Sequence, residues 1–334
     1  MRILITGGCG FLGSHVVDHF LQQPDTSIVV LDRLSYASNG FDRLRDSQRF
    51  DDKRVLVLAA DFTRPIVDGL AREIGQVDVI LHLGAETHVD RSIADPRPFV
   101  LSNVVGTMEL LELARRQRQL RRFIYLSTDE VYGPALPGVA YREWDRYNSC
   151  NPYAASKAGG EELCLAWANT YGVPVTVVRT MNIFGERQHA EKFIPTTLRH
   201  LLDGTHVPIH TDLNGKIGSR FWIHARNVAG AIDFLVEVGA VREKYNVVGE
   251  LELNNLEMAK LVADAALIPL RYKRVHGGVS RPGHDARYAL DGAKLAGMGW
   301  QPPIDFYTSL SKTVRWYLAN PRWLRQETYT EVAV

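Results

Sequence analysis

The chain begins with a glycine-rich turn, Gly7-Gly8-Cys9-Gly10-Phe11-Leu12-Gly13, between an apolar run at residues 3–6 and an amphipathic stretch at residues 12–22. Glycines at positions 7, 10 and 13 permit a tight turn, close approach of the backbone to a pyrophosphate, and close packing of the helix on the strand. The turn therefore predicts a dinucleotide site at the start of the first helix. A plain structural turn is the alternative, because this glycine spacing alone is weak evidence.

Outward from the turn, apolar runs of strand length alternate with amphipathic stretches of helical length. The strand-length runs lie at residues 3–6, 27–31, 54–59, 77–83, 123–127 and 175–179, and the helical stretches include residues 12–22, 98–116 and 154–171. This alternation predicts an α/β fold with a Rossmann-type doubly wound parallel sheet, whose ligands bind at the carboxyl ends of the strands.

After about Asn182 the alternation weakens. Short strands are predicted at residues 206–209, 221–223 and 245–248, followed by a helix from Asn255. We therefore expect a dinucleotide-binding domain at residues 1–185, with a return segment near residues 221–240, and a smaller mixed α/β substrate domain at residues 186–334. Four C-terminal aromatic residues have spacings typical of core packing: Trp300, Trp316, Tyr317 and Trp323.

The composition excludes several classes of protein. The chain has 334 residues, 46% hydrophobic and 23% charged, with a formal net charge of +1, which suits a soluble enzyme and not a nucleic-acid or membrane surface. Its three cysteines lack CxxC spacing, so we expect no disulfide or metal site and a reducing, cytoplasmic compartment. The first strand begins at once and no span reaches membrane length, so neither a signal peptide nor a transmembrane helix is expected.

The second predicted strand ends at Asp32. A carboxylate there accepts hydrogen bonds from a ribose 2′-hydroxyl and repels a 2′-phosphate, which favours NAD over NADP. Arg33 keeps NADP open, because a neighbouring arginine can bind a 2′-phosphate. After the third strand, Asp61 and Phe62 are expected to meet the adenine ring, with a structural turn as the alternative.

Two pairs of polar residues indicate the chemistry. Tyr153 and Lys157 are four residues apart on a predicted helix, so both side chains reach one cofactor, and a lysine ammonium near a phenol favours the phenolate used in hydride transfer. Asp129 and Glu130 directly follow a predicted strand and could serve as an acid and a base. A solvated cap at the strand end is the alternative for this pair.

Together these motifs resemble the extended short-chain dehydrogenase/reductases, and within them the nucleoside-diphosphate-sugar 4,6-dehydratases. The specific feature is Thr128-Asp129-Glu130 ahead of Val131-Tyr132-Gly133, upstream of Tyr153 and Lys157. Supporting segments run the whole length of the chain, at residues 32–37, 82–93, 103–107, 191–195 and 281–285.

The resemblance implies an NAD-dependent dehydration of a nucleoside-diphosphate hexose to its 4-keto-6-deoxy form. Tyr153 would take the O4 proton while C4 gives hydride to NAD⁺, with Thr128 on the same oxygen and Lys157 on the nicotinamide ribose. Glu130 would then remove the C5 proton and Asp129 would protonate O6, so that water leaves and hydride returns to C6.

The resemblance also implies the binding residues. Cofactor contacts are expected from Gly7, Gly10, Phe11, Leu12, Gly13, Asp32, Ser35, Asp61, Phe62, Leu83, Ala85, Ser102, Tyr153 and Lys157. Substrate contacts are expected from Thr87, Asn182, Lys192, Arg220, Asn246, Arg281 and His284. Surface ion pairs are the alternative for Lys192 and Arg220, a structural histidine for His284, and a local cap for Thr87. The helices at residues 98–116 and 154–171 would pair across a two-fold axis as a four-helix bundle in a homodimer, unless their surplus apolar surface is simply core.

Other readings remain on the same scaffold. A 4-epimerase, a decarboxylase or a 5,6-dehydratase would share the tyrosine and lysine, although an epimerase does not need Asp129 and Glu130. A non-catalytic NAD-binding protein is the remote alternative. Ile183 and Glu186 depart from the asparagine and proline of the resembling family, which leaves the nucleotide base and the hexose open.

Overall fold

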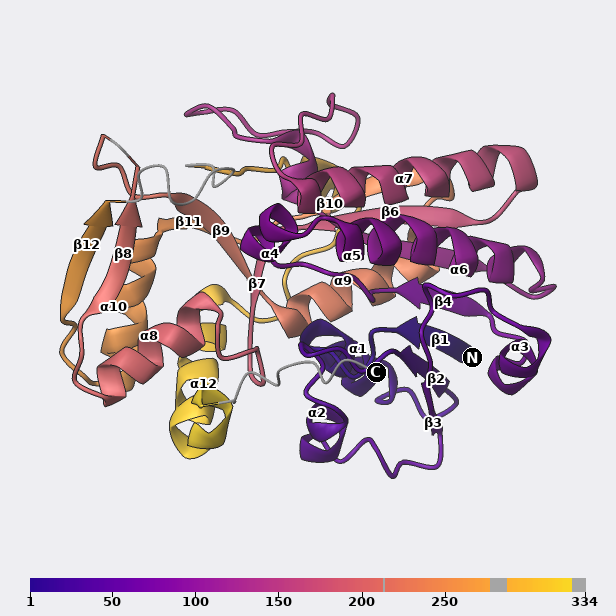
Figure 1. Cartoon of the computed structure of the whole chain (residues 1–334), viewed down its shortest axis with the longest axis horizontal. Helices are drawn as coiled ribbons and strands as arrows, with labels where there is room; N and C mark the ends of the chain where they lie inside the picture. The colour runs from indigo at the N-terminus through magenta and orange to yellow at the C-terminus, as the bar shows by residue number, and fades with distance from the viewer. Residues whose placement is uncertain (213, 277–286, 326–334) are drawn as a thin grey trace.

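The computed structural model describes residues 1–212, 214–276 and 287–325. Its central sheet has seven parallel strands in the order β10-β6-β5-β4-β1-β2-β3 (Figure 1). The strands are β1 (Arg2–Thr6), β2 (Ser27–Asp32), β3 (Val55–Ala59), β4 (Val79–His82), β5 (Arg122–Thr128), β6 (Val175–Thr180) and β10 (Glu243–Val247). The strand order reverses beside β1, as in a doubly wound sheet, which confirms the predicted fold class.

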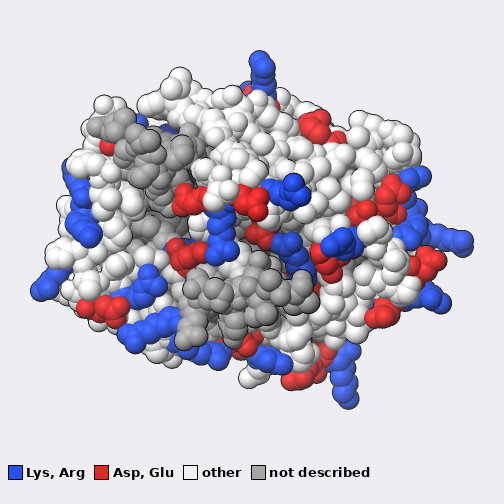
Figure 2. All heavy atoms as spheres, in the orientation of Figure 1, with Lys and Arg blue, Asp and Glu red and all other residues white. Residues whose placement is uncertain are grey.

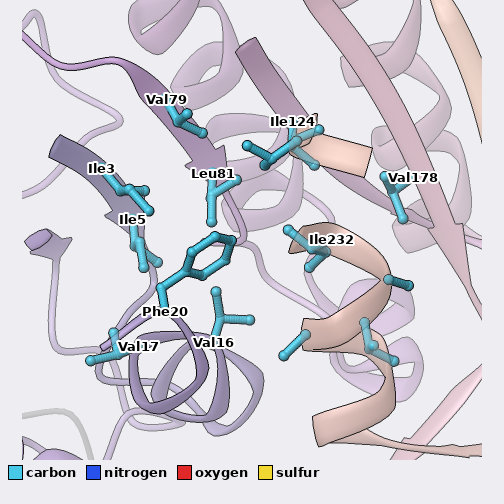
Figure 3. Packing of buried hydrophobic residues seen from close by; sticks show 14 of the residues in the cluster. Ile3, Ile5, Val16, Val17, Phe20, Val79, Leu81, Ile124, Val178 and Ile232 are labelled. Atoms are coloured by element: carbon cyan, nitrogen blue, oxygen red, sulfur yellow. The ribbon is translucent and has the colours of Figure 1, made fainter. Parts of the chain in front are cut away.

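Helices cover both faces of this sheet. On one face lie α1 (Phe11–Phe20) and α9 (Ala225–Val238), and on the other lie α3 (Asp68–Ile74), α6 (Gly106–Arg115) and α7 (Pro152–Tyr171). Side chains alternate along each strand, so Ile3 and Ile5 of β1 face α1 and α9 while Leu4 faces the opposite layer. Figure 3 shows Phe20 of α1 pointing into the same core as Ile232 of α9.

The smaller unit lies to the left in Figure 1 and contains two sheets, in the orders β11-β9-β7 and β12-β8. Its strands are β7 (Asn182–Phe184), β8 (Val207–Thr211), β9 (Ser219–His224), β11 (Leu251–Asn254) and β12 (Tyr272–His276), and its helices are α8 (Phe193–Leu202), α10 (Asn255–Ala266), α12 (Phe306–Ala319) and η3 (Pro321–Leu324). Tyr317 and Trp323 are buried in its core and Trp316 packs against them, as predicted. Trp300 instead packs against the core of the central sheet.

Two parts of the chain differ from the sequence prediction. The strand predicted near residues 245–248 within the smaller unit is β10, the edge strand of the central sheet, which the chain reaches after α9 returns to that sheet. The helix predicted at residues 98–116 consists of α5 (Arg97–Val100), the π-helical turn η1 (Leu101–Val105) and α6. π-Turns inside helices occur frequently at functional sites, and η1 contains Ser102.

Four short helical elements complete the described chain: α2 (Asp42–Asp46), α4 (Val89–Ala94), η2 (Asp129–Tyr132) and α11 (Ala293–Gly297). On the face shown in Figure 2, acidic and basic side chains are interspersed, in keeping with the small net charge. Among the described helices, none is both long and apolar enough to cross a membrane.

Candidate active site

The glycine turn between β1 and α1 is tightly packed. Gly7 has a φ of +69°, and a Cβ added to Gly13 would lie 2.0 Å from the Gly7 carbonyl oxygen. A Cβ on Gly7 would lie 2.7 Å from the Cα of Gly84 in the loop after β4. No described side chain caps α1 at Gly10, so its first amides are free to bind an anion. This cradle fits a dinucleotide pyrophosphate.

Asp32 at the end of β2 is buried and held by the backbone. Its two carboxylate oxygens accept hydrogen bonds from the amides of Cys9, at 2.9 Å, and Leu34, at 2.8 Å. Burial raises the pKa of this carboxyl. The neighbouring Arg33 forms an ion pair with Glu86 of the loop after β4. Arg33 is therefore engaged by a carboxylate, and the site fits the 2′-hydroxyl of NAD better than a 2′-phosphate.

Most of the other predicted cofactor residues, including Asp61 after β3, follow strands of the central sheet. Ser35 follows β2, Leu83 and Ala85 flank Gly84 after β4, and Ser102 lies in η1. Phe62 is buried, and its ring lies 5.7 Å from that of His82, so it packs under the loop after β4.

A buried chain of hydrogen bonds, not foreseen from the sequence, positions that loop. Thr107 donates to the Asn103 carbonyl at 2.7 Å, so its oxygen accepts from His82 Nε2 at 3.0 Å. His82 Nδ1 then accepts from Thr6 at 2.7 Å, and Thr6 accepts from the Gly84 amide at 3.1 Å. Burial lowers the pKa of His82 well below its usual value. A neutral histidine thus connects Gly84 to η1.

Tyr153 and Lys157 are buried on one face of α7. The Lys157 ammonium lies 4.2 Å from the centre of the Tyr125 ring, and burial lowers its pKa to about 7. Burial, and then the charges of Glu130 and Asp129, raise the pKa of Tyr153 far above its usual value. Burial is the largest of these causes and the two carboxylates add to it, so both favour the neutral phenol.

The predicted acid–base pair, Asp129 and Glu130, lies where β5 ends and η2 begins. Thr128 donates to Asp129 at 3.0 Å and accepts from the Glu130 amide at 3.3 Å. Burial, and then the charge of Glu130, raise the pKa of Asp129 to about 7. Asn151 was not predicted as a site residue, yet its amide donates to Glu130 at 2.8 Å and its oxygen caps α7 by accepting from the Ala154 amide at 2.8 Å. One side chain therefore positions both Glu130 and the helix of Tyr153.

A buried ion pair between Glu161 and Arg179 influences the protonation of Lys157. Glu161, one helical turn beyond Lys157, pairs with Arg179 of β6, whose Nε lies 3.0 Å from the carboxylate. Arg179 holds the pKa of Glu161 below its usual value despite burial. The Glu161 charge in turn favours the protonated form of Lys157. The four-residue spacing from Lys157 is the sequence signal that could have revealed Glu161.

The predicted substrate residues are divided between two regions. Asn182 on β7 and Arg220 on β9 lie on neighbouring strands of the smaller unit, and the positive charge of Arg220 partly opposes the rise that burial and Glu130 cause in the pKa of Asp129. Thr87 is exposed in the loop after β4. Lys192 lies 3.8 Å from the Glu191 carboxylate.

Asn246 lies elsewhere, buried in β10. Its amide nitrogen donates to the carbonyls of Tyr141, at 3.0 Å, and Asp291, at 3.1 Å, which leaves only its side-chain oxygen for a ligand. Arg281 and His284 lie outside the described residues. Among the residues that are described, no group of three or more His, Cys, Asp or Glu side chains is arranged to hold a metal ion.

Comparisons with known proteins agree with this geometry. Residues 3–248 match the NAD dependent epimerase/dehydratase family. A dTDP-glucose 4,6-dehydratase from Actinoplanes sp. is 39% identical over 97% of this chain and 99% of its own length. The structure of a dTDP-glucose 4,6-dehydratase from Streptomyces venezuelae with NAD and TYD bound superposes with a TM-score of 0.87, at 37% identity over 97% of this chain and 98% of that one. A Thermus thermophilus UDP-glucose 4-epimerase in complex with NAD has a TM-score of 0.85 at 26% identity, over 95% of this chain and 99% of that one.

Proposed function

The chain belongs to the NAD dependent epimerase/dehydratase family, and we propose that Thr128, Asp129, Glu130, Tyr153 and Lys157 are the residues that perform its reaction. It is an NAD-dependent hydro-lyase that converts a nucleoside-diphosphate hexose to the 4-keto-6-deoxy sugar. When bound, NAD⁺ brings a positive charge, accepts a hydride from C4 and returns it to C6. We propose dTDP-glucose as the substrate, since relatives covering the whole chain act on it.

Each of the proposed residues has one task. Tyr153 takes the proton from O4, and the Thr128 hydroxyl hydrogen-bonds the same oxygen. Lys157 binds the nicotinamide ribose of NAD and contributes a positive charge. Once C4 is a ketone, the C5 proton is acidic, and Glu130 removes it. Asp129 gives its proton to O6, so the C6–O6 bond breaks and one water leaves, and C5 takes up a proton that has exchanged with solvent when C6 receives the hydride.

The observation that carries this function is the unequal environment of the two adjacent carboxyls. Asp129 is buried and its pKa is raised to about 7, so much of it is a protonated acid at neutral pH. Glu130 is only half-buried and accepts a hydrogen bond from Asn151 at 2.8 Å, which favours a carboxylate. An acid and a base side by side are needed for elimination. A 4-epimerase has no use for them.

We further propose a division of labour along the chain. Residues 1–185, together with α9 and β10, hold the cofactor, because the glycine turn, Asp32 and Tyr153 all belong to the central sheet and its helices. The remainder holds the nucleotide sugar together with Asn182 at the border between the two parts, supported by the position of Arg220 on β9, the strand that pairs with β7. The three cysteines are free, which supports a reducing, cytoplasmic location.

The product identifies the function. We expect dTDP-glucose incubated with the enzyme in heavy water to lose one water, to gain one solvent deuteron at C5, and to leave no net NADH. UDP-glucose and UDP-N-acetylglucosamine, followed in parallel by mass spectrometry, test the nucleotide and the C2 substituent. An unchanged mass with inversion at C4 would show a 4-epimerase instead, and a product that keeps a 5,6 double bond would show a 5,6-dehydratase.

We propose that the chain forms a homodimer through a four-helix bundle of α6 and α7 with their symmetry mates. Next to α6, Val100 and Leu101 are 47% and 45% exposed, which is high for adjacent apolar residues on a helical surface. We expect light scattering to give the mass of a dimer, and Val100→Glu to give a monomer. Val67→Glu, at an exposed valine before α3, is the control that should remain dimeric. A monomeric wild type would refute the proposal.

A further inference from the structure

The four residues that follow β7, residues 185–188, are here called the crossing segment, because they connect β7 to the rest of the smaller unit, toward α8. All four of their backbone carbonyls accept hydrogen bonds from side chains. The single hydroxyl proton of Tyr317 is shared between the carbonyls of residues 185 and 188, each of which lies 3.2 Å from the phenol oxygen. His15 Nε2 donates to that of residue 186 at 3.0 Å, and Arg43 Nε donates to that of residue 187 at 2.8 Å. Side-chain donors at every carbonyl of an irregular segment hold its path in place.

The three donors come from distant parts of the fold. His15 lies on α1, the helix that begins at the glycine turn. Arg43, on α2, also donates to the carbonyls of Ala37 and Ser38 in the loop after β2, the loop in which Ser35 is a predicted cofactor residue. Tyr317 lies on α12 in the smaller unit. The crossing segment is therefore where the cofactor helix, the loop after β2 and the smaller unit are joined.

These contacts are buried and independent of pH near neutrality. His15, Arg43 and Tyr317 are each at most 3% exposed. Burial lowers the pKa of His15 to about 3, so the ring is neutral and its Nε2 proton is committed to the carbonyl of residue 186. Burial lowers the pKa of Arg43 only to about 10, so it stays charged.

A second layer fixes the same segment through the side chain of Glu186. Its carboxylate pairs with His224, at 3.1 Å, and Arg226, at 2.9 Å. Glu186 stands where the resembling dehydratases have proline, and its charge is used within the protein and not for the sugar. The contact between Glu186 and His224 connects the crossing segment to the end of β9, the strand that contains Arg220.

We propose that His15, Arg43 and Tyr317 are positioning residues that hold the sugar-binding unit in one orientation relative to the cofactor helix. The inference rests on the proposed function, which needs one bound hexose to present C4, C5 and C6 in turn to fixed groups. An orientation error of about 1 Å can cost about a hundredfold in rate. Loss of one donor therefore loosens the two units relative to each other without removing any group that touches the substrate.

The orientation can be measured without turnover. In a Cys150→Ser background, with the labelled chain mixed with an excess of unlabelled chain, spin labels at Val67→Cys and Leu267→Cys report the distance between the units within one subunit, since these sites are 63% and 91% exposed. We expect one narrow distance distribution in the otherwise unchanged protein and at least a twofold broader one in Tyr317→Phe or His15→Phe. His15→Gln, which restores an N–H donor, should narrow it again. Equal widths in all these variants would overturn the inference whether or not the enzyme is a dehydratase.

Kinetics give the second test, on the chain without labels. Tyr317→Phe should lower kcat by about tenfold or more while the dissociation constant of the nucleoside diphosphate alone stays within about twofold. Tyr307→Phe, at an exposed tyrosine of the same helix, should change neither quantity. A lower melting temperature with unchanged kcat would show that Tyr317 contributes only to stability.

Discussion

Replacing Tyr153 with phenylalanine is expected to lower kcat by about 10³-fold, within the roughly 10²–10⁴-fold contribution of a positioned acid–base group. The side chain is 8% exposed on α7, and its hydroxyl interacts with Thr128. Phenylalanine keeps the ring and its packing against Phe99, whose ring centre lies 6.4 Å away. The proton on O4 then has no acceptor, so oxidation at C4, the first chemical step, should stop.

Single-turnover absorbance of NADH and mass analysis of the sugar measure this loss directly. We expect neither NADH nor product from Tyr153→Phe, with the affinity for the nucleotide sugar little changed. Tyr171→Phe is the matched control, because Tyr171 is an exposed tyrosine at the far end of the same helix. If Tyr153→Phe kept kcat within about tenfold of the wild type, another group would have to accept the proton.

The parts of the fold that the sequence predicts are those encoded locally. The glycine turn, with the strand before it and the helix after it, depends largely on neighbouring residues, because a Cβ on Gly10 or Gly13 would meet the backbone of Gly7. The place of β10 is different. Whether residues 243–247 join the central sheet depends on α9 packing on the same face as α1, and no pattern within the strand itself records that packing.

The same distinction applies to the site. Tyr153, Lys157, Asp129 and Glu130 stand in short motifs, and the sequence alone proposes all four. The role of Asn151 could be suspected only as a helix cap, since asparagine before a proline is typical of a helix start. Its second contact, with Glu130, joins two segments separated by a long loop, and hydrogen bonds of this kind leave no periodic signal.

The roles of charged residues depend on partners that lie far away in the sequence. From the sequence, Arg33 could bind a 2′-phosphate, but in the structure it forms an ion pair with Glu86. Likewise, Glu186 could alter the sugar site, but in the structure its carboxylate pairs with His224 and Arg226. The role of a buried charged residue can be assigned only when its partner is known, because burying a charge without a partner is unfavourable. Partners far apart in the sequence appear only in the folded chain.

Replacing Glu130 with glutamine is expected to separate oxidation from elimination. The amide has the shape of the carboxylate and still accepts the hydrogen bond from Asn151, so the start of α7 should be undisturbed. Without the base the C5 proton stays, and formation of dehydrated product should fall by about 10²–10⁴-fold. NADH should then accumulate on the enzyme, and deuterium should no longer enter C5. Glu162→Gln, at an exposed acid on α7, is the control expected to show neither change.

The protonation state of Asp129 should determine how the rate of elimination depends on pH. Asp129 can donate to O6 only while protonated, and its pKa is raised to about 7 by burial and by the charge of Glu130. The rate of elimination is therefore expected to be highest below about pH 7 and to fall as the pH rises through that value. In Asp129→Asn the descending limb should vanish and the whole profile should lie about 10²–10⁴-fold lower. A descending limb that survived in Asp129→Asn would assign it to another group, and Lys157, whose pKa is lowered to about 7, would be the first to examine.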